Sequence, residues 1–463
     1  MKWLLLGLAT AALALAAPAA AGPHGDAVMA GRVKAEFLHA WTGYRRYAWG
    51  HDELRPLSRK PYDWYGTSLL MTPVDALDTL VLMRLKKEAR ADRNLIANRL
   101  DFDKDVSVKT FEVTIRLLGG LLSGYELTGD ERLLAKARDL GDRLAPAFNS
   151  PTGLPYPYIN LRTGKPSGVQ SNPAETGTLI LEFGTLSKLT GNPVYYQKAK
   201  RALVETFKRR SSLGLIGAGL NVETGAWTDP DSSVSGGIDS YYEYLWKCWR
   251  LFGDKDCLAM WRASIGPIDR YLADDVGGHL WYGHADMTTG ARTASQYGAL
   301  DAYFPGLLVL SGDVDRAARL QDSSFRMWRL EGIEPEVLDY RTMSVVSPGY
   351  ELRPEIVESA FYLSHYTQDA KYRAMGRDIL ADLERWDRTP TGYASLRSVV
   401  SKHKRDAMPS YALAETFKYL FLLFDPAALD FDRVTLNTEA HPLTRAWTES
   451  GGASRYLVRQ PSD

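Results

Sequence analysis

The chain has 463 residues, and its 56 Lys and Arg residues balance 56 Asp and Glu residues, so its formal net charge is zero. A balanced charge excludes bulk attraction to nucleic acid or to an anionic membrane, and favours a neutral or locally charged ligand. No Pro/Ser-rich linker divides the chain, so we expect a single domain after the N-terminal segment.

The N-terminal segment has the three parts of a secretory signal. A basic start at Lys2 is followed by an apolar run over residues 4–16 and by the small residues Ala19, Ala20 and Ala21. We therefore expect a signal peptide over residues 1–21, one domain over 22–445 and a C-terminal tail over 446–463. No later run is long and apolar enough to span a membrane, so we expect an exported protein, periplasmic or secreted.

A turn signature recurs about every sixty residues after the signal segment. Each copy follows an apolar helical run and precedes another, which predicts the elbow of a helical hairpin. The regular copies are Leu127-Thr128-Gly129-Asp130, Leu189-Thr190-Gly191-Asn192, Leu251-Phe252-Gly253-Asp254 and Leu310-Ser311-Gly312-Asp313. Degenerate copies are Met83-Arg84-Leu85, Tyr366-Thr367-Gln368-Asp369 and Leu423-Phe424-Asp425-Pro426. About seven helical hairpins follow from this count, stacked either as an open solenoid or as a closed ring.

A second repeat distinguishes the two arrangements. Thr163-Gly164, Thr224-Gly225 and Thr289-Gly290 lie in segments rich in Gly, Pro and aromatic residues, which predict short β-hairpins between the helical units. An acid lies near the start of each following helix, and the acids of this kind are Glu112, Glu175, Asp239, Asp301, Glu355 and Glu415. We expect an all-α fold, a closed α/α barrel with short β-hairpins at one end, in which these acids converge on one mouth.

The chain has two cysteines, Cys248 and Cys257, on either side of the elbow at Gly253. An oxidising compartment would allow them to form a disulfide. The buried helix position expected for Cys248 favours two free thiols instead.

For two of the acids, a purely structural interpretation competes with a functional role. Glu112 and Arg116 are four residues apart and share a helix face, where they form either a surface ion pair or a buried pair at a barrel end. The apolar neighbours of the pair favour burial. Asp239 follows a glycine turn, and taken alone it is best explained as a helix N-cap, although the tyrosines around Glu243 favour a pocket wall.

The C-terminal acids lie in helices that are otherwise apolar. Arg353, Glu355 and Glu358 surround the start of a helix, where the helix dipole alone would favour the acids. Glu415 needs a partner, which Lys418 could supply from the next turn. The Asn437-Thr438-Glu439 turn offers a hydroxyl and a carbonyl of the kind that calcium prefers.

Together these acids would give one cavity more negative charge than a protein tolerates without cations, protons or ordered water. The acids in question are Glu112, Asp239, Glu355, Glu358, Glu415 and Glu439. Such a cavity suits glycoside hydrolysis, which needs one protonated carboxyl at the leaving oxygen and one carboxylate to activate water.

The chain resembles the class I α-1,2-mannosidases, glycoside hydrolase family 47, over nearly all of its mature length. The resemblance rests on motifs in the family's order: Ala48 to Leu54 with Pro56 and Ser58, Asp75 to Leu80, Phe111 to Gly120, Asp239 to Leu245, Leu352 to Glu355, Ala414 to Leu420, and Asn437 to Pro442. It implies an (α/α)7 barrel, in agreement with the repeat count. It also implies calcium-dependent, inverting removal of α-1,2-linked mannose from an oligosaccharide or a glycoprotein glycan, by a protein we expect to be a monomer.

The resemblance also implies roles for individual residues. Glu112 is expected to be the general acid, Glu355 the base that activates water, and Asp239 the third catalytic carboxylate, with the base assignment between the last two left open. Thr438 is expected to bind Ca²⁺. The residues expected to hold the terminal sugar and the waters on the metal are Arg116, Arg353, Glu358, Tyr411, Glu415 and Glu439.

Two positions depart from the family pattern. Tyr411 occupies a place where phenylalanine is usual, and Gly237 one where some members carry a bulky or basic residue. Two other functions remain open from sequence: a non-catalytic mannose-binding protein similar to quality-control lectins, and an inverting glycosidase of another α/α barrel family that acts on glucosides.

Overall fold

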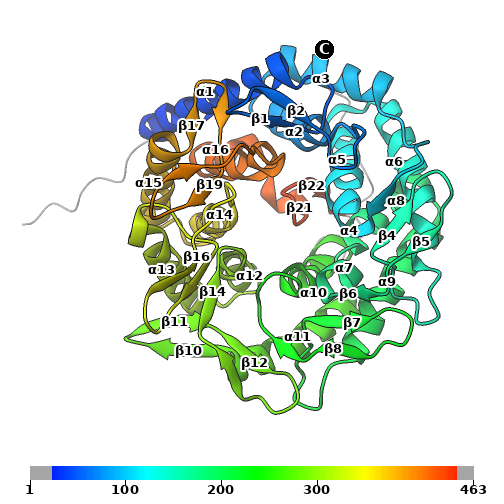
Figure 1. Ribbon diagram of the computed structural model, residues 1–463, viewed down its shortest axis with the longest axis vertical. Coiled ribbons are helices and arrows are strands. Elements are labelled where there is room, and N and C mark those ends of the chain that lie inside the picture. Colours follow the sequence, from blue (N-terminus) through cyan, green and yellow to red (C-terminus); the bar gives the residue numbers. More distant parts are fainter. Residues whose placement is uncertain (1–22, 446–463) are drawn as a thin grey trace, which may run out of the picture.

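The computed structural model describes residues 23–445 and forms an (α/α)7 barrel (Figure 1). Seven inner helices surround the axis: α2 (Met71–Leu82), α5 (Gly119–Thr128), α8 (Ile180–Thr190), α10 (Asp239–Phe252), α12 (Phe304–Leu310), α14 (Glu355–Thr367) and α16 (Phe417–Phe424). Seven outer helices cover them: α1 (Pro23–Tyr47), α3 (Lys86–Arg99), α6 (Glu131–Leu144), α9 (Pro193–Lys208), α11 (Lys255–Tyr271), α13 (Val314–Glu331) and α15 (Ala370–Trp386). The predicted fold class is confirmed. The signal segment and the C-terminal tail lie outside the described residues.

The ring closes because its first and last helices pack together. Outer helix α1, at the start of the described chain, lies against inner helix α16 near its end (Figure 1). Phe37 of α1 and Phe417 of α16 form an edge-to-face aromatic contact, with ring centroids 6.3 Å apart. The hairpins are therefore arranged as a closed barrel, and not as an open solenoid.

Three of the predicted elbows share one backbone geometry. Gly129, Gly191 and Gly253 end their inner helices in the left-handed region, with φ of 67°, 73° and 71°. Glycine adopts this conformation without a steric penalty. The next residue, Asp130 in the first elbow, caps the outer helix by accepting the backbone N–H of Arg132. Local sequence chemistry thus reverses the chain at these three elbows.

Short strands occupy the opposite end of the barrel, where the inner helices begin. Four three-stranded sheets have the strand orders β3-β4-β5, β6-β7-β8, β13-β12-β9 and β14-β15-β16. Their bounds are β3 (Ser107–Lys109), β4 (Tyr158–Asn160), β5 (Pro166–Ser167), β6 (Gln170–Ser171), β7 (Gly219–Asn221), β8 (Trp227–Asp229), β9 (Asp231–Ser232), β12 (His284–Asp286), β13 (Arg292–Ala294), β14 (Gln296–Gly298), β15 (Val337–Asp339) and β16 (Ser344–Ser347). The strand before an inner helix pairs with the hairpin after its outer partner, so each sheet joins the two ends of one helical pair.

The other strands form two-stranded hairpins. They are β1 (Glu53–Arg55) with β2 (Lys60–Tyr62), β10 (Ala273–Val276) with β11 (His279–Tyr282), β17 (Arg388–Thr389) with β18 (Gly392–Tyr393), β19 (Leu396–Ser398) with β20 (His403–Lys404), and β21 (Val434–Leu436) with β22 (Pro442–Thr444). The last hairpin differs from the rest because it lies inside the ring (Figure 1). It contacts α5 and α10 from within the barrel.

Short helical segments precede several inner helices. They are α4 (Thr110–Val113), α7 (Pro173–Gly177), the 3₁₀ turn η3 (Leu300–Tyr303) and the π-helical turns η1 (Thr114–Leu118) and η4 (Ala412–Thr416). Further 3₁₀ turns are η2 (Ala145–Phe148), η5 (Pro426–Ala428) and η6 (Phe431–Arg433). The π-helical turns both lie at the mouth, where they alter the angle at which the following side chains enter the barrel.

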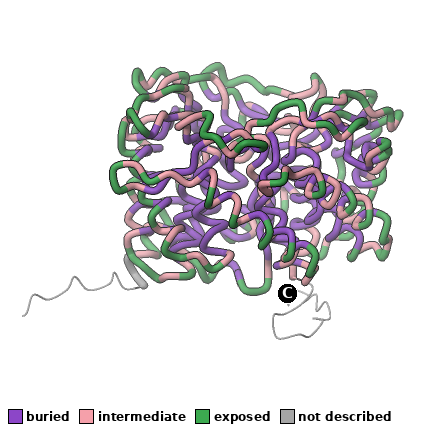
Figure 2. Tube along the Cα trace, turned by 90° about the horizontal axis from the view of Figure 1, so that it is seen from below, coloured by how far each residue is buried: buried purple, intermediate pink, exposed green. Residues whose placement is uncertain are grey.

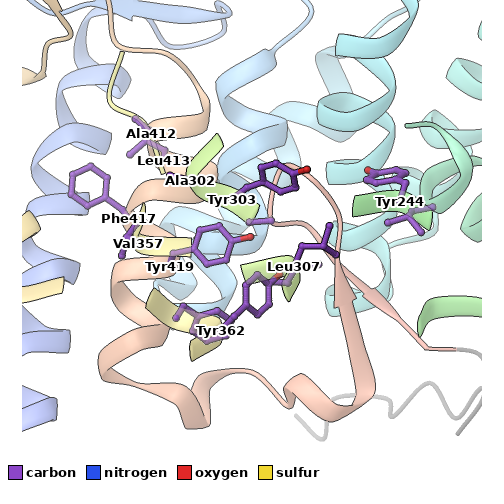
Figure 3. Close-up of a cluster of buried hydrophobic side chains, with 14 of the residues drawn as sticks. Tyr244, Ala302, Tyr303, Leu307, Val357, Tyr362, Ala412, Leu413, Phe417 and Tyr419 are labelled. Carbon is purple, nitrogen blue, oxygen red and sulfur yellow. The ribbon is translucent and has the colours of Figure 1, made fainter. Parts of the chain in front are cut away.

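Buried residues fill the interior of the barrel (Figure 2). Tyr244, Tyr303, Tyr362 and Tyr419 are among the buried side chains that the inner helices bring together there (Figure 3). Within residues 23–445, no helix combines the length and the apolar character that crossing a bilayer requires.

The expectation of two free thiols is wrong. Cys248 of α10 and Cys257 of α11 form a disulfide, with their Cα atoms 6.0 Å apart. Both side chains are fully buried, as expected for Cys248. A buried position does not prevent the bond, because the elbow at Gly253 folds the two helices against each other and brings the two Cα atoms within disulfide reach.

Candidate active site

A cavity of about 270 Å³ lies at the mouth end of the barrel, among the first turns of the inner helices and the tip of the β21–β22 hairpin. All ten residues expected at the site line it. They are Glu112, Arg116, Asp239, Arg353, Glu355, Glu358, Tyr411, Glu415, Thr438 and Glu439. Residues up to 327 positions apart in the chain therefore meet in one pocket, because the ring brings successive inner helices to a common axis.

The turn that carries Thr438 is held by the side chain of Asn437. The Asn437 amide donates to the Ile115 carbonyl at 2.9 Å and to Glu182 at 2.8 Å. Its oxygen accepts the backbone N–H groups of Glu439 and His441. A Cβ at Gly119 would come within 2.6 Å of the Asn437 amide nitrogen, so the absence of a side chain there allows the hairpin tip to approach the helix.

An ion cluster lies on this same hairpin, fully buried. Asp78 of α2 accepts from His441 at 2.7 Å and pairs with Lys418 at 2.7 Å. Burial opposes ionisation of Asp78, but these two cations outweigh it and lower its pKa to about 2. Burial would also lower the pKa of His441, yet Asp78 raises it to about 9. Lys418 further donates to the Ala440 carbonyl, so the cluster fixes the hairpin to two inner helices.

The π-helical turns η1 and η4 each contribute a charged residue to the pocket. Arg116 in η1 donates from Nε to Glu112 at 3.0 Å and from Nη1 to Glu439 at 2.6 Å. Its guanidinium also lies 5.4 Å from the ring centres of Trp64 and Tyr411. The predicted buried pair of Glu112 and Arg116 is thus present, with the arginine buried and the glutamate partly accessible from the cavity.

A second arginine is held by an acid that the sequence analysis did not identify. Arg353 donates to both carboxylate oxygens of Glu336, at distances of 2.8 to 3.1 Å. Tyr411, whose hydroxyl donates to the Glu351 carbonyl at 2.7 Å, lies 5.8 Å from this guanidinium. Glu336 follows a proline just before β15, and that local pattern gives no indication of its distant partner.

Asp239 and Glu355 begin inner helices α10 and α14. Asp239 is not an N-cap: its carboxylate accepts from the backbone and the hydroxyl of the adjacent Ser240, inside the helix. Burial raises the pKa of Asp239 to about 7, and the neighbouring acid Glu243 adds to the shift. Burial likewise raises the pKa of Glu355 to about 8. One buried oxygen of Glu355 accepts no hydrogen bond from the described residues, so it is free to take one from water or substrate.

The remaining acids add to the negative charge of the cavity. Burial raises the pKa of Glu358, Glu415 and Glu439, and their mutual repulsion contributes to the shift at Glu415. Lys418 does not pair with Glu415, because it is engaged with Asp78. Glu439 pairs with Arg116, whereas Glu358 accepts a hydrogen bond from the neutral Tyr419 hydroxyl at 3.1 Å.

The oxygen groups around Thr438 fit a hard cation. Thr438 lines the cavity, and its backbone N–H donates to the Tyr244 hydroxyl at 3.3 Å. In the described part of the chain, the acids of this cavity do not bring three carboxylate oxygens within 4.8 Å of one another. Any ion here would therefore be held by Thr438 and water, with the carboxylates stabilising that water.

Some expectations about the acids at helix starts fail. Asp301 does not line the cavity, since η3 turns its carboxylate to accept the backbone N–H of Gly298 at 2.8 Å. Glu175 does line it and pairs there with Lys109 at 2.7 Å, an interaction that the sequence did not suggest. Gly237 also lines the cavity and has a φ of 88°, a conformation that residues with a side chain rarely adopt.

The sequence of residues 36–445 matches the model of glycosyl hydrolase family 47. The chain belongs to this family. Alpha-mannosidase I MNS4 of Arabidopsis thaliana is 40% identical to this family 47 chain over 420 residues, which cover 88% of the chain and 66% of that protein. The endoplasmic reticulum mannosyl-oligosaccharide 1,2-alpha-mannosidase of Rattus norvegicus is 38% identical, with the same coverage. The chain thus spans about two thirds of the length of these relatives.

Another family 47 relative is named for protein degradation. The human ER degradation-enhancing alpha-mannosidase-like protein 2 is 37% identical, and the match covers 90% of the chain and 77% of that protein. Among solved structures, the alpha-1,2-mannosidase from Trichoderma reesei superposes with a TM-score of 0.82 at 28% identity, covering 90% of this chain and 99% of that one. Cellobiose 2-epimerase from Bacillus thermoamylovorans, at a TM-score of 0.55 and 13% identity, is similar in fold alone.

Proposed function

We propose that this protein is a calcium-dependent, inverting exo-α-1,2-mannosidase. One observation supports it above the others: Glu112 of α4, Asp239 of α10 and Glu355 of α14 line the same cavity as Thr438. Inverting hydrolysis needs an acid and a base on opposite faces of a sugar, and a barrel supplies them from different helices. Family membership supports the same chemistry.

In this proposal, Glu112 is the general acid. Arg116 fixes its carboxyl through the 3.0 Å hydrogen bond, while the accessible part of the side chain faces the cavity. From that position it delivers a proton to the glycosidic oxygen, directly or through one water, and the leaving sugar departs as an alcohol.

Glu355 is the proposed base. Its unpartnered oxygen can accept from the attacking water. Burial raises its pKa to about 8 in the metal-free protein, and the positive charge of a bound calcium ion would favour the ionised form that accepts a proton. Asp239 is the third carboxylate. Which of Asp239 and Glu355 is the base is tested by comparing the pH profiles of activity of variants at the two positions.

Calcium, when bound, would supply positive charge and oxygen coordination next to the carboxylates. Thr438 would hold it through its hydroxyl and carbonyl, and Glu358, Glu415 and Glu439 would orient the water around it. Arg116 and Arg353, each fixed by a carboxylate, are placed to bind sugar hydroxyls. Tyr411 offers a ring for the sugar to stack on.

We further propose that the protein acts outside the cytoplasm, in the periplasm or as a secreted enzyme. The disulfide of Cys248 and Cys257 supports an oxidising compartment, and the expected signal segment points the same way. Terminal mannose on external glycans or mannans is the substrate that suits this location.

The test is incubation with α-1,2-mannobiose, with and without EDTA, followed by NMR. Calcium-dependent release of mannose, with β-mannose as the first product, supports the proposal. Binding without release supports the mannose-binding alternative. Release that EDTA does not affect contradicts the calcium dependence, and initial α-mannose rules out inversion.

A further inference from the structure

A second, larger cavity joins the active-site pocket at the mouth. Its volume is about 940 Å³, and five residues line both spaces: Lys109, Glu112, Arg116, Arg353 and Tyr411. The β1–β2 hairpin, strand β4 and the segment after β20 form its other walls. The two cavities are therefore parts of one continuous depression.

The three proposed catalytic acids are not distributed equally between the two spaces. Glu112 lines both cavities, whereas Asp239 and Glu355 line the smaller one alone. A general acid lies beside the oxygen that joins the departing sugar to the rest of the substrate. With the terminal mannose among the acids of the smaller cavity, the remainder of the chain continues past Glu112 into the larger one.

The larger cavity has exposed aromatic walls. Tyr62 on β2 and Tyr158 on β4 line it and are 38% and 39% accessible. The Arg55 guanidinium lies 4.6 Å from the ring centre of Tyr62 and backs one of its faces. Tyr158 stands opposite Lys109 in the β3–β4 pairing, next to the junction of the two cavities.

Exposed rings of this kind suit a carbohydrate chain. The C–H faces of a pyranose stack on tyrosine, and a rigid ring loses little conformational entropy when it does so. A backing guanidinium holds the Tyr62 ring in place. The cavity volume lies at the upper end of the range for small-molecule sites, enough for more than one sugar.

We propose that the leaving-group side of the substrate, a chain of at least two further mannose residues, binds in the larger cavity on Tyr62 and Tyr158. This inference depends on the proposed function, because it takes Glu112 as the general acid. It makes the enzyme selective for oligomannose chains over the disaccharide, since a disaccharide reaches Tyr158 at the junction but ends before Tyr62.

The kinetic test compares kcat/KM for linear α-1,2-mannotetraose with that for α-1,2-mannobiose. The wild type should prefer the tetraose. Tyr62→Ala should reduce the ratio by roughly tenfold, the effect of losing one good apolar contact in a pocket. Tyr158→Ala, at the junction that the disaccharide also reaches, should lower kcat/KM for both substrates. Tyr62→Phe keeps the ring and should preserve the ratio. Tyr366→Ala removes another exposed tyrosine, at the elbow end of α14, and should also preserve it.

A binding test does not need turnover. In the Glu112→Gln background, calorimetry with α-1,2-mannotetraose should show weaker binding when Tyr62 is replaced by Ala. Equal kcat/KM for the two substrates, or tyrosine variants that alter neither the ratio nor binding, would overturn the inference. The inference would also be overturned if the ratio of kcat/KM values changed in Leu300→Ala, on the other rim of the smaller cavity, instead of in the tyrosine variants. Failure of the wild type to release mannose, with tyrosine-dependent binding intact, would contradict the proposed function and leave the binding groove supported.

Discussion

Arg116 and Glu439 are 323 positions apart in the chain, yet the guanidinium donates to the carboxylate at 2.6 Å inside the barrel. One partner comes from the π-helical turn before α5, and the other from the hairpin that enters the ring after the last inner helix. The contact links the proposed acid, which shares the same arginine, to the proposed calcium site. The position of the proposed acid and the geometry of the proposed calcium site therefore depend on the same arginine.

Replacing Glu112 by Gln should reduce kcat by roughly 10²- to 10⁴-fold, because a carboxamide cannot deliver the proton. Its shape and its contact with Arg116 are retained, so thermal unfolding should be little changed. Glu131→Gln, on the exposed outer helix α6, is the matched control and should keep full activity. Near-normal turnover of Glu112→Gln on mannobiose would remove it from its role.

Thr438→Ala should weaken calcium binding by roughly tenfold or more, since the hydroxyl ligand is lost and the carbonyl alone remains. Calorimetric titration with Ca²⁺ measures this directly. Thr163→Ala, in the exposed β4–β5 turn, should bind calcium as the wild type does. Unchanged affinity in Thr438→Ala would contradict the metal assignment.

The metal-free protein should lose stability as the pH rises from about 5 to 8. Asp239 and Glu355 have folded-state pKa values of about 7 and 8, raised by burial, whereas in an unfolded chain they titrate near 4. Over this interval the folded state binds more protons than the unfolded state, so unfolding becomes easier with increasing pH.

Calcium should offset that loss, because its charge stabilises the ionised carboxylates. The increase in melting temperature on adding Ca²⁺ should therefore be larger at pH 8 than at pH 5.5, as scanning calorimetry would show. A metal-free melting temperature that rises between these pH values would disprove the assigned direction of the shifts.

Asp78→Asn should destabilise the fold by about 3 kcal/mol, because buried Lys418 loses its anion and His441 keeps only Asp75, at 3.5 Å. Urea unfolding gives the free energy directly. Asp256→Asn breaks an exposed pair with Lys200 and should cost less than about 1 kcal/mol. Equal effects of the two substitutions would mean that the buried cluster does not anchor the hairpin.

Replacing both Cys248 and Cys257 by Ser should cost about 3 kcal/mol of stability through the loss of a short closed loop. The disulfide lies at the elbow end of α10, away from the first turn that carries Asp239. Turnover at moderate temperature should therefore be retained. A variant that unfolds like the wild type under reducing and oxidising conditions alike would show that the bond does not form.

Much of the barrel is encoded locally. The elbow at Gly129 and Asp130 combines a left-handed glycine with a side-chain cap, and both can be recognised from adjacent residues. The recurrence of such elbows predicted the helical pairs and their number. Acids at the helix starts, such as Glu112 and Glu355, could be identified in the same way, because charged groups are out of place in helices that are otherwise apolar.

Contacts between residues that are distant in the sequence could not be predicted in this way. Glu336 and Arg353 are 17 positions apart with two strands between them, and nothing next to either residue indicates the pair. Asp301 has the same position at a helix start as its counterparts, but a 3₁₀ turn directs it elsewhere. The disulfide was not predicted because burial alone does not show whether two cysteines face each other.

The sequence by itself determined the seven helical pairs, the closed ring and the acids available to it, because periodicity, capping and turn chemistry act over a few residues. Only the tertiary structure decided which of those acids share a cavity, how the π-helical turns direct Arg116 and Glu415 into it, and that the final hairpin brings Thr438 beside them. The reason is geometric: closing the ring sets the distances between side chains hundreds of residues apart, and local propensities carry no information about those distances.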